Sequence, residues 1–284
     1  MSQLKFRFRA PKDVIKDYVD VSFVVTGYSW RRYLGDYWPY IDYLYEGRKG
    51  GFILYGYHYL RFAGRFCRWC GSEEIVSDLG LCSKCYGSPN GIKYRVIVKG
   101  YKEVGDPTIY DLIADLLHYR YILYLGSFGS KLKVGISRLN RDGDFRGYLG
   151  RIIEQGLDSA VVFDGGYDLL QAQEMEKTIS SDFGISQVIR FNEKLDELQN
   201  GTSYRDVRDV AEDILREYRD LSVIWFGRIS WSEPRSFDHI WREDVIDGEL
   251  IYARGNIAIF ETGSKKIAVN LSSLAGRGII TEEL

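Results

Sequence analysis

Short apolar and aromatic runs, separated by glycine and charged residues, fill the first part of the chain. Leu4, Phe6 and Phe8 alternate with polar residues at period two, which predicts a strand. The runs VDVSFVVTGY and GFILYGYHYLRFAGRF have the same aromatic-rich character. We therefore predict a small antiparallel β module over residues 1–66.

The pattern after the turn-rich sequence GSPNG alternates between strands and helices. Residues 93–99 (KYRVIVK) predict a strand. A helix is expected to begin at Asp106-Pro107, because proline is favoured in the first turn. Its apolar positions are Ile109, Leu112, Ile113, Leu116 and Leu117.

The middle of the chain predicts a compact α/β unit, to which we assign residues 93–192. Its expected elements are strands over 121–125 and 132–136 around the loop SFGSK, a helix near 148–155, a strand over 160–163, and a helix capped by Asp168 that runs to about Phe183.

The last part of the chain predicts a helix followed by strands. The sequence NEKLDELQNGTS (192–203) reads as a polar linker. Residues 203–221 predict an amphipathic helix with a charged, solvated face, and residues 245–284 predict strands. We treat 203–284 as a helix plus C-terminal β module, so the predicted fold class is α+β.

Composition limits the classes of partner. The net charge is −2 and the pI is near 6.0, so a nucleic-acid contact must use a local basic patch. The N-terminal sequence has no apolar core of a signal peptide, and no window reaches the length of a membrane span. We expect a cytoplasmic protein without a membrane partner.

Tyrosine is abundant, with 22 residues. A tyrosine ring can be half-buried at the rim of a core, or it can stack on an exposed nucleobase. The sequence leaves both interpretations open.

Two CxxC pairs, Cys67/Cys70 and Cys82/Cys85, are separated by 11 residues. Each pair can direct two thiolates at one ion, and two pairs complete a tetrahedral site without an open position. Gly71 and Gly80 suit the tight turns beside them. We predict a structural Zn²⁺ site in a zinc ribbon over 67–92; a redox CxxC is the alternative interpretation.

The hairpin ILYLGSFGSKLKVGIS resembles the opening of the GIY-YIG endonuclease superfamily. Ile122-Leu123-Tyr124 corresponds to the first motif element and Lys133-Val134-Gly135 to the second, followed by Ser137. The resemblance implies an arginine on the next helix, where Arg151 stands. It also implies a glutamate in the sequence A-x-x-x-E-K, which matches Ala172 to Lys177.

The resemblance implies roles for three residues. Tyr124 would act as general base or position a water molecule, Arg151 would neutralise the scissile phosphate, and Glu176 would hold one Mg²⁺. The residues themselves point to Glu176 independently, because it falls within an apolar helix face where a carboxylate needs a partner, an ion or a polar surface. A glutamate with partners at the rim of the core is the simpler reading. That face consists of Leu169, Ala172, Met175, Ile179 and Phe183.

The sequence departs from the nuclease pattern at one position. Lys133 replaces the tyrosine of the second motif, and lysine neutralises phosphate but does not accept a proton at neutral pH. We therefore expect a phosphate-binding site, and the sequence leaves its catalytic competence open. Its basic residues would be Lys133, Arg138, Arg141 and Arg146, with Arg146 as the alternative to Arg151.

The order of the motifs is also similar to an uncharacterised prokaryotic family that joins a four-cysteine zinc ribbon to such a hairpin. The similarity spans residues 65–275 and includes RIIEQG at 151–156. It implies no established activity. We expect a zinc-containing protein that binds RNA or DNA, with ribosome association as one option. An active Mg²⁺-dependent endonuclease and a protein–protein scaffold are the alternatives.

Overall fold

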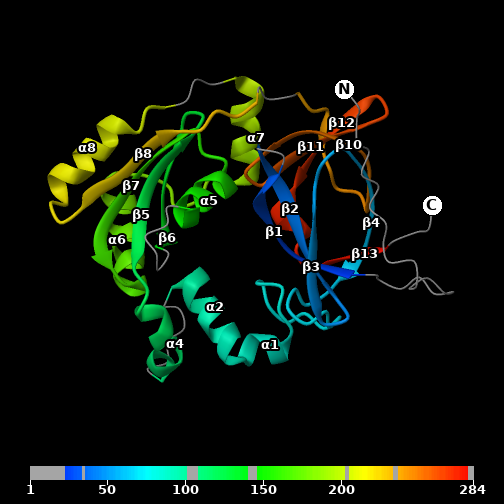
Figure 1. Ribbon diagram of the computed structural model, residues 1–284, viewed down its shortest axis with the longest axis horizontal. Coiled ribbons are helices and arrows are strands. Elements are labelled where there is room, and N and C mark those ends of the chain that lie inside the picture. The colour runs from blue at the N-terminus through cyan, green and yellow to red at the C-terminus, as the bar shows by residue number, and fades with distance from the viewer. Residues whose placement is uncertain are drawn as a thin grey trace. The chain divides into compact units, whose positions relative to one another are not determined.

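The computed structural model describes residues 23–33, 36–100, 108–139, 146–201, 205–232 and 236–280. The chain forms two compact units. It passes from unit 1 to unit 2 after Ser88 and returns to unit 1 between residues 234 and 235. Unit 1 contains the first and the last parts of the chain, and unit 2 contains the part between them. In Figure 1, unit 1 is therefore blue to teal and orange to red, and unit 2 runs from teal through green and yellow to gold.

Unit 1 is built on a nine-stranded sheet with the strand order β3-β2-β1-β13-β4-β10-β11-β12-β9. All strand pairs are antiparallel except β12 with β9. The strands are β1 (Phe23–Tyr33), β2 (Asp36–Tyr45), β3 (Arg48–Ile53), β4 (Tyr57–Arg65), β9 (His239–Ile240), β10 (Val245–Arg254), β11 (Ile257–Thr262), β12 (Lys265–Asn270) and β13 (Arg277–Ile280), with a 3-10 turn at Leu271–Leu274.

The two ends of the chain share one core in unit 1. Strand β13 lies between β1 and β4, and β4 also pairs with β10. Buried Ile41 and Phe62 from the first part belong to the same cluster as Phe260 and Ile279 from the last part. We expected 1–66 and 203–284 to form separate modules; instead, neither set of strands has a complete core without the other.

The prediction for Leu4, Phe6 and Phe8 lies outside the described residues. The predicted mixed α+β fold class is confirmed.

Unit 2 contains a four-stranded antiparallel sheet with the order β6-β5-β7-β8. The predicted hairpin, helix, strand and helix are confirmed, and a fourth strand joins the edge. The elements are α2 (Pro89–Lys99), α4 (Ile109–Leu117), β5 (Tyr121–Phe128), β6 (Lys131–Arg138), α5 (Arg146–Gln155), β7 (Ser159–Tyr167), α6 (Leu169–Asp182), α7 (Phe191–Asn200), α8 (Arg208–Glu217) and β8 (Ser222–Arg228).

The prediction of a strand over residues 93–99 was wrong, because these residues are part of helix α2. Val96 of α2 is fully buried in a cluster with Ile113 of α4 and Ala172 of α6. Packing against other helices has overridden the preference of Val and Ile for strands. Pro89 at the first position of α2 suits a helix start.

The prediction of a polar linker over residues 192–203 was also wrong. Most of this segment forms helix α7. The helix buries two charged residues, Lys194 and Glu197, beside Leu195 and Leu198. Hydrophobic periodicity does not detect a helix whose buried face is half ionic.

The sheet of unit 2 has two different faces. Leu123 and Leu125 of β5 point into an apolar core with residues of α6 and α8, such as Ile179 and Ile214. Side chains alternate along a strand, so Tyr124 points to the opposite face, which carries α5. Helix α8 and strand β8 thus belong to unit 2 and not to the C-terminal strands.

No helix within the described part of the chain has both the length and the apolar character needed to cross a membrane.

Candidate metal centre and candidate phosphate-binding site

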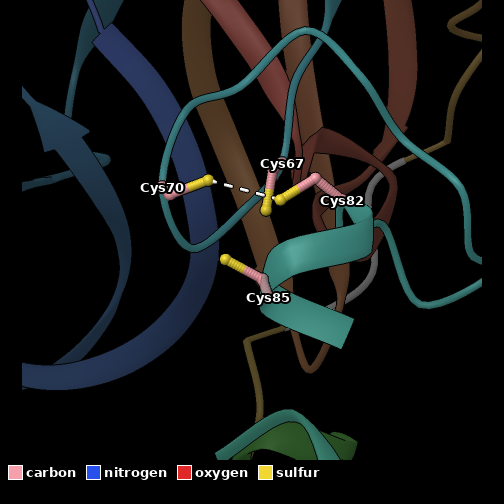
Figure 2. Close-up of side chains that lie close together, drawn as sticks. All are labelled: Cys67, Cys70, Cys82 and Cys85. Carbon is pink, nitrogen blue, oxygen red and sulfur yellow. Dashed lines mark hydrogen bonds between the residues drawn. The ribbon is translucent and has the colours of Figure 1, made fainter. Parts of the chain in front are cut away.

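The four cysteines converge, as predicted. Figure 2 shows Cys67 and Cys70 on the loop after β4, and Cys82 and Cys85 at the start of α1 (Ser83–Gly87). The four sulfur atoms all lie within 4.8 Å of one another, and the Sγ atoms of Cys70 and Cys82 are 3.6 Å apart. Tetrahedral Zn–S bonds of about 2.3 Å place sulfurs about 3.8 Å apart. The four thiols therefore fit one tetrahedral metal ion.

Local backbone geometry directs each pair of thiols. The N–H of Gly71 donates to the Cys67 carbonyl at 2.8 Å, and Gly71 has a φ of +76°, which closes the first turn. Cys82 is the residue immediately before α1, so Cys85 follows within its first helical turn. The second pair thus uses a helix start where we expected another tight turn.

The two halves of the cluster are joined to each other and to the sheet of unit 1. The N–H of Arg68 donates to the carbonyl of Gly80 at 3.1 Å. The Arg68 side chain donates twice to the carbonyl of Thr26 on β1, at 2.8 and 3.1 Å. The segment between the cysteine pairs has Leu81 as its one fully buried apolar residue other than cysteine, within the described residues.

The thiols have unequal proton affinities. Burial opposes ionisation of Cys67, but backbone N–H groups, including that of Cys82, outweigh it and lower the pKa of this thiol to about 7. Burial and the neighbouring thiols raise the pKa of Cys85. One thiol therefore loses its proton readily, and a bound cation would favour ionisation of the others.

A second group of polar residues gathers around Lys133 in unit 2 and comes from β5, β6, α5 and α6. We define the Lys133 cluster as Tyr124, Lys133, Arg151, Gln155 and Glu176. Lys133 on β6 is 5 % exposed, and its Nζ donates to the Gln155 Oε1 at 3.1 Å. The same Nζ lies 5.6 Å from the centroid of the Tyr124 ring, within cation–π range.

Glu176 belongs to this cluster through electrostatics. Burial raises the pKa of its carboxyl group, whereas the charges of Lys133 and Arg151 lower it, with a net value of about 7. Glu176 stands on helix α6, which contacts β6, the strand that carries Lys133. Within the described residues, no hydrogen bond or ion pair within 4 Å holds Glu176.

Of the three predicted residues, Tyr124 contacts Lys133, and Glu176 lies within electrostatic range of Lys133 and Arg151. Arg151 is exposed and forms a 3.3 Å ion pair with Glu154 on the same helix. Arg138 does not join them. It lies five residues along β6, about 17 Å away, and its guanidinium stacks on the Tyr119 ring. Arg141 and the side chain of Arg146 lie outside the described residues.

Sequence reasoning missed two residues beside the cluster. Gln155 accepts from Lys133 through its side chain, and its backbone carbonyl accepts from the Nζ of Lys194 at 2.8 Å. Gln155 stands within the motif RIIEQG, which was a signal, but the buried Lys194 lies in the segment interpreted as a linker.

Gly135 sets the position of the Tyr124 ring. The two residues face each other across β5 and β6, and an added Cβ at Gly135 would overlap the ring of this fully buried tyrosine. We predict that Gly135→Ala lowers the free energy of unfolding by about 2 kcal/mol, a typical cost of overpacking. Urea denaturation would measure the loss. Gly150→Ala is the control, because an added Cβ there meets no atom within 4 Å.

Comparisons with known proteins assign no relative: no family model, no curated protein and no solved structure matches the chain.

Proposed function

We propose that this protein binds nucleic acid and that the Lys133 cluster holds a backbone phosphate. The observation that carries the proposal is the buried Lys133, whose ammonium group contacts Tyr124 and Gln155 and acts electrostatically on Glu176, as does Arg151. Burial of a cation is costly unless an anion or several acceptors compensate for the lost water. A phosphodiester provides both charge and acceptor oxygens.

The order of elements around the cluster supports the same proposal. Strands β5 and β6, helix α5, strand β7 and helix α6 follow the order that the GIY-YIG resemblance implies. Tyr124, Arg151 and Glu176 stand on the first strand, the first helix and the later helix of that order. Lys133 in place of a tyrosine favours binding over cleavage, because an ammonium group is not a general base.

The cysteine cluster completes the proposal as a structural zinc site. Four sulfur ligands suit Zn²⁺ and leave no position for a substrate. Its role is to fold the segment between β4 and α2. A reducing compartment such as the cytoplasm keeps these thiols available for metal.

Removal of the positive charge of Arg151 tests the proposal. Arg151→Ala is expected to weaken binding of a labelled single-stranded RNA or DNA by about tenfold, and to reduce the slope of log K against log[salt] by about one. Fluorescence anisotropy at several salt concentrations measures both. Arg216→Ala is the matched control, because Arg216 is an exposed arginine paired with Asp213 on α8.

Other outcomes would select the alternatives. Cleavage of the nucleic acid by wild-type protein with Mg²⁺, abolished by Glu176→Gln but not by Glu174→Gln, would identify an endonuclease. Equal binding by wild type and Arg151→Ala, with an unchanged salt slope, would contradict the proposed site. A protein partner that still binds the Arg151→Glu variant would favour the scaffold.

A further inference from the structure

The resemblance to nucleases implies a Mg²⁺ ion at Glu176, and the residues present do not suit one. Mg²⁺ prefers oxygen ligands, commonly with more than one negative group near it. The charged groups that act on Glu176 are Lys133 and Arg151, both cationic. A dication at Glu176 would therefore be repelled by two positive side chains and attracted by one carboxylate.

Lys133 has hydrogen-bonding capacity to spare. An ammonium group has three N–H donors, and Gln155 is the one acceptor of Lys133 within the described residues. Lys133 is nevertheless buried and only 5 % exposed. Two N–H donors of this buried cation are thus left for acceptors other than Gln155, such as phosphate oxygens.

We infer that the ammonium group of Lys133 takes the place of a divalent cation at this site, so that the protein holds a phosphodiester without metal. The inference rests on the proposed function and specifies how its site works. Lys133 and Arg151 are the cations offered to the phosphodiester, and Glu154 and Glu176 are the acidic residues that act on them.

Each side chain has a distinct task in this arrangement. Lys133 donates its two remaining N–H groups to phosphate oxygens, and Arg151 approaches from the exposed end of the site. Glu176 acts on the two cations through its charge and limits their mutual repulsion. Gln155 is a positioning residue, because its Oε1 fixes the direction of the ammonium group.

The first test compares binding with and without divalent cations. Zinc-loaded wild-type protein is titrated into a fluorescein-labelled single-stranded DNA, and into the RNA of the same sequence. The titration is done in Mg²⁺ and in Mg²⁺-free buffer of equal ionic strength. We expect Mg²⁺ not to strengthen binding, because the proposed site needs no metal and Mg²⁺ competes with the protein for the phosphates. Binding that needs Mg²⁺ would overturn the inference and leave the proposed function intact.

The second test asks directly whether Lys133 excludes a metal ion. Mn²⁺ binding is followed by its paramagnetic resonance signal. Wild type is expected to bind no Mn²⁺ at this site, whereas Lys133→Met should gain a site at least about tenfold tighter than any in wild type, worth 1.4 kcal/mol. Glu176→Gln added to Lys133→Met should remove the gain, and Lys265→Met, an exposed lysine in unit 1, should not produce it.

The two tests separate the possible failures. A Mn²⁺ site in wild type that Glu176→Gln removes would overturn the inference, as would a folded Lys133→Met variant that gains none. If wild type binds neither nucleic acid, the proposed function fails, and the Mn²⁺ measurement still decides whether Lys133 excludes the metal. Circular dichroism of each variant establishes that it is folded.

Discussion

Removal of the metal is expected to release the segment between β4 and α2 from the sheet of unit 1. The protein should contain about one zinc ion per chain by elemental analysis. Zinc contributes about 10–16 kcal/mol to the folding of small finger peptides, and this segment has little other core than Leu81 and the cysteines. A strong chelator should therefore raise amide hydrogen exchange over residues 67–87 by several orders of magnitude.

A ligand substitution separates metal loss from effects of the chelator. Cys67→Ser should lose the zinc and show the same fast exchange, because Cys67 is fully buried and its thiol has a lowered pKa. Ser83→Ala is the control, since Ser83 is exposed between the two ligands of α1. Protection that survives the chelator but disappears with a reductant would contradict a metal site and indicate a disulfide.

The cysteine cluster is the feature that the sequence predicted best. The spacing of two CxxC pairs carries its own geometry, because each pair brings two thiols together within one turn. The structure adds how the turns are held, through Arg68 and the carbonyl of Thr26. That contact joins residues far apart in the chain, and nothing in the local pattern encodes it.

The organisation of the strands was harder to predict. Local alternation identifies a strand but not its neighbour, and β13 lies between β1 and β4 although it is the last strand of the chain. The strand prediction for residues 93–99 was wrong for a related reason. Its β-branched residues favour a strand locally, and the buried contacts of Val96 with α4 and α6 stabilise a helix.

The candidate phosphate site could be predicted only in part. Tyr124, Arg151 and Glu176 were identified by resemblance. Tyr124 contacts Lys133, and Glu176 lies within electrostatic range of Lys133 and Arg151. Lys133 and Arg138 are an odd number of positions apart on β6, so their side chains point to opposite faces of the sheet and Arg138 is not part of the site. This conclusion needed the observed extent of β6 and its register with β5. The support from α7 was missed, because charged residues normally indicate a solvated surface and not a buried one.

Helix α7 leads to the second large expected effect. Glu197 is buried and accepts two hydrogen bonds from Ser130 in the β5–β6 turn, at 2.6 Å from the backbone N–H and 2.7 Å from the hydroxyl. Glu197→Ala is expected to lower the free energy of unfolding by about 2 kcal/mol, because hydrogen bonds to a charged group contribute about 1.5–3 kcal/mol each and water replaces part of this at the exposed Ser130. Urea denaturation followed by circular dichroism measures the loss.

The same substitution should also reach the Lys133 cluster, because the turn that Glu197 holds is the start of the strand that carries Lys133. Amide exchange should therefore rise in β5 and β6 while the sheet of unit 1 keeps its protection. Asp196→Ala is the matched control, since Asp196 is the exposed neighbour on α7. If the Glu197→Ala variant were as stable as Asp196→Ala, α7 would not stabilise the β5–β6 hairpin. The position of Lys133 would then be set by its hydrogen bond to Gln155 and by the register of β6 with β5.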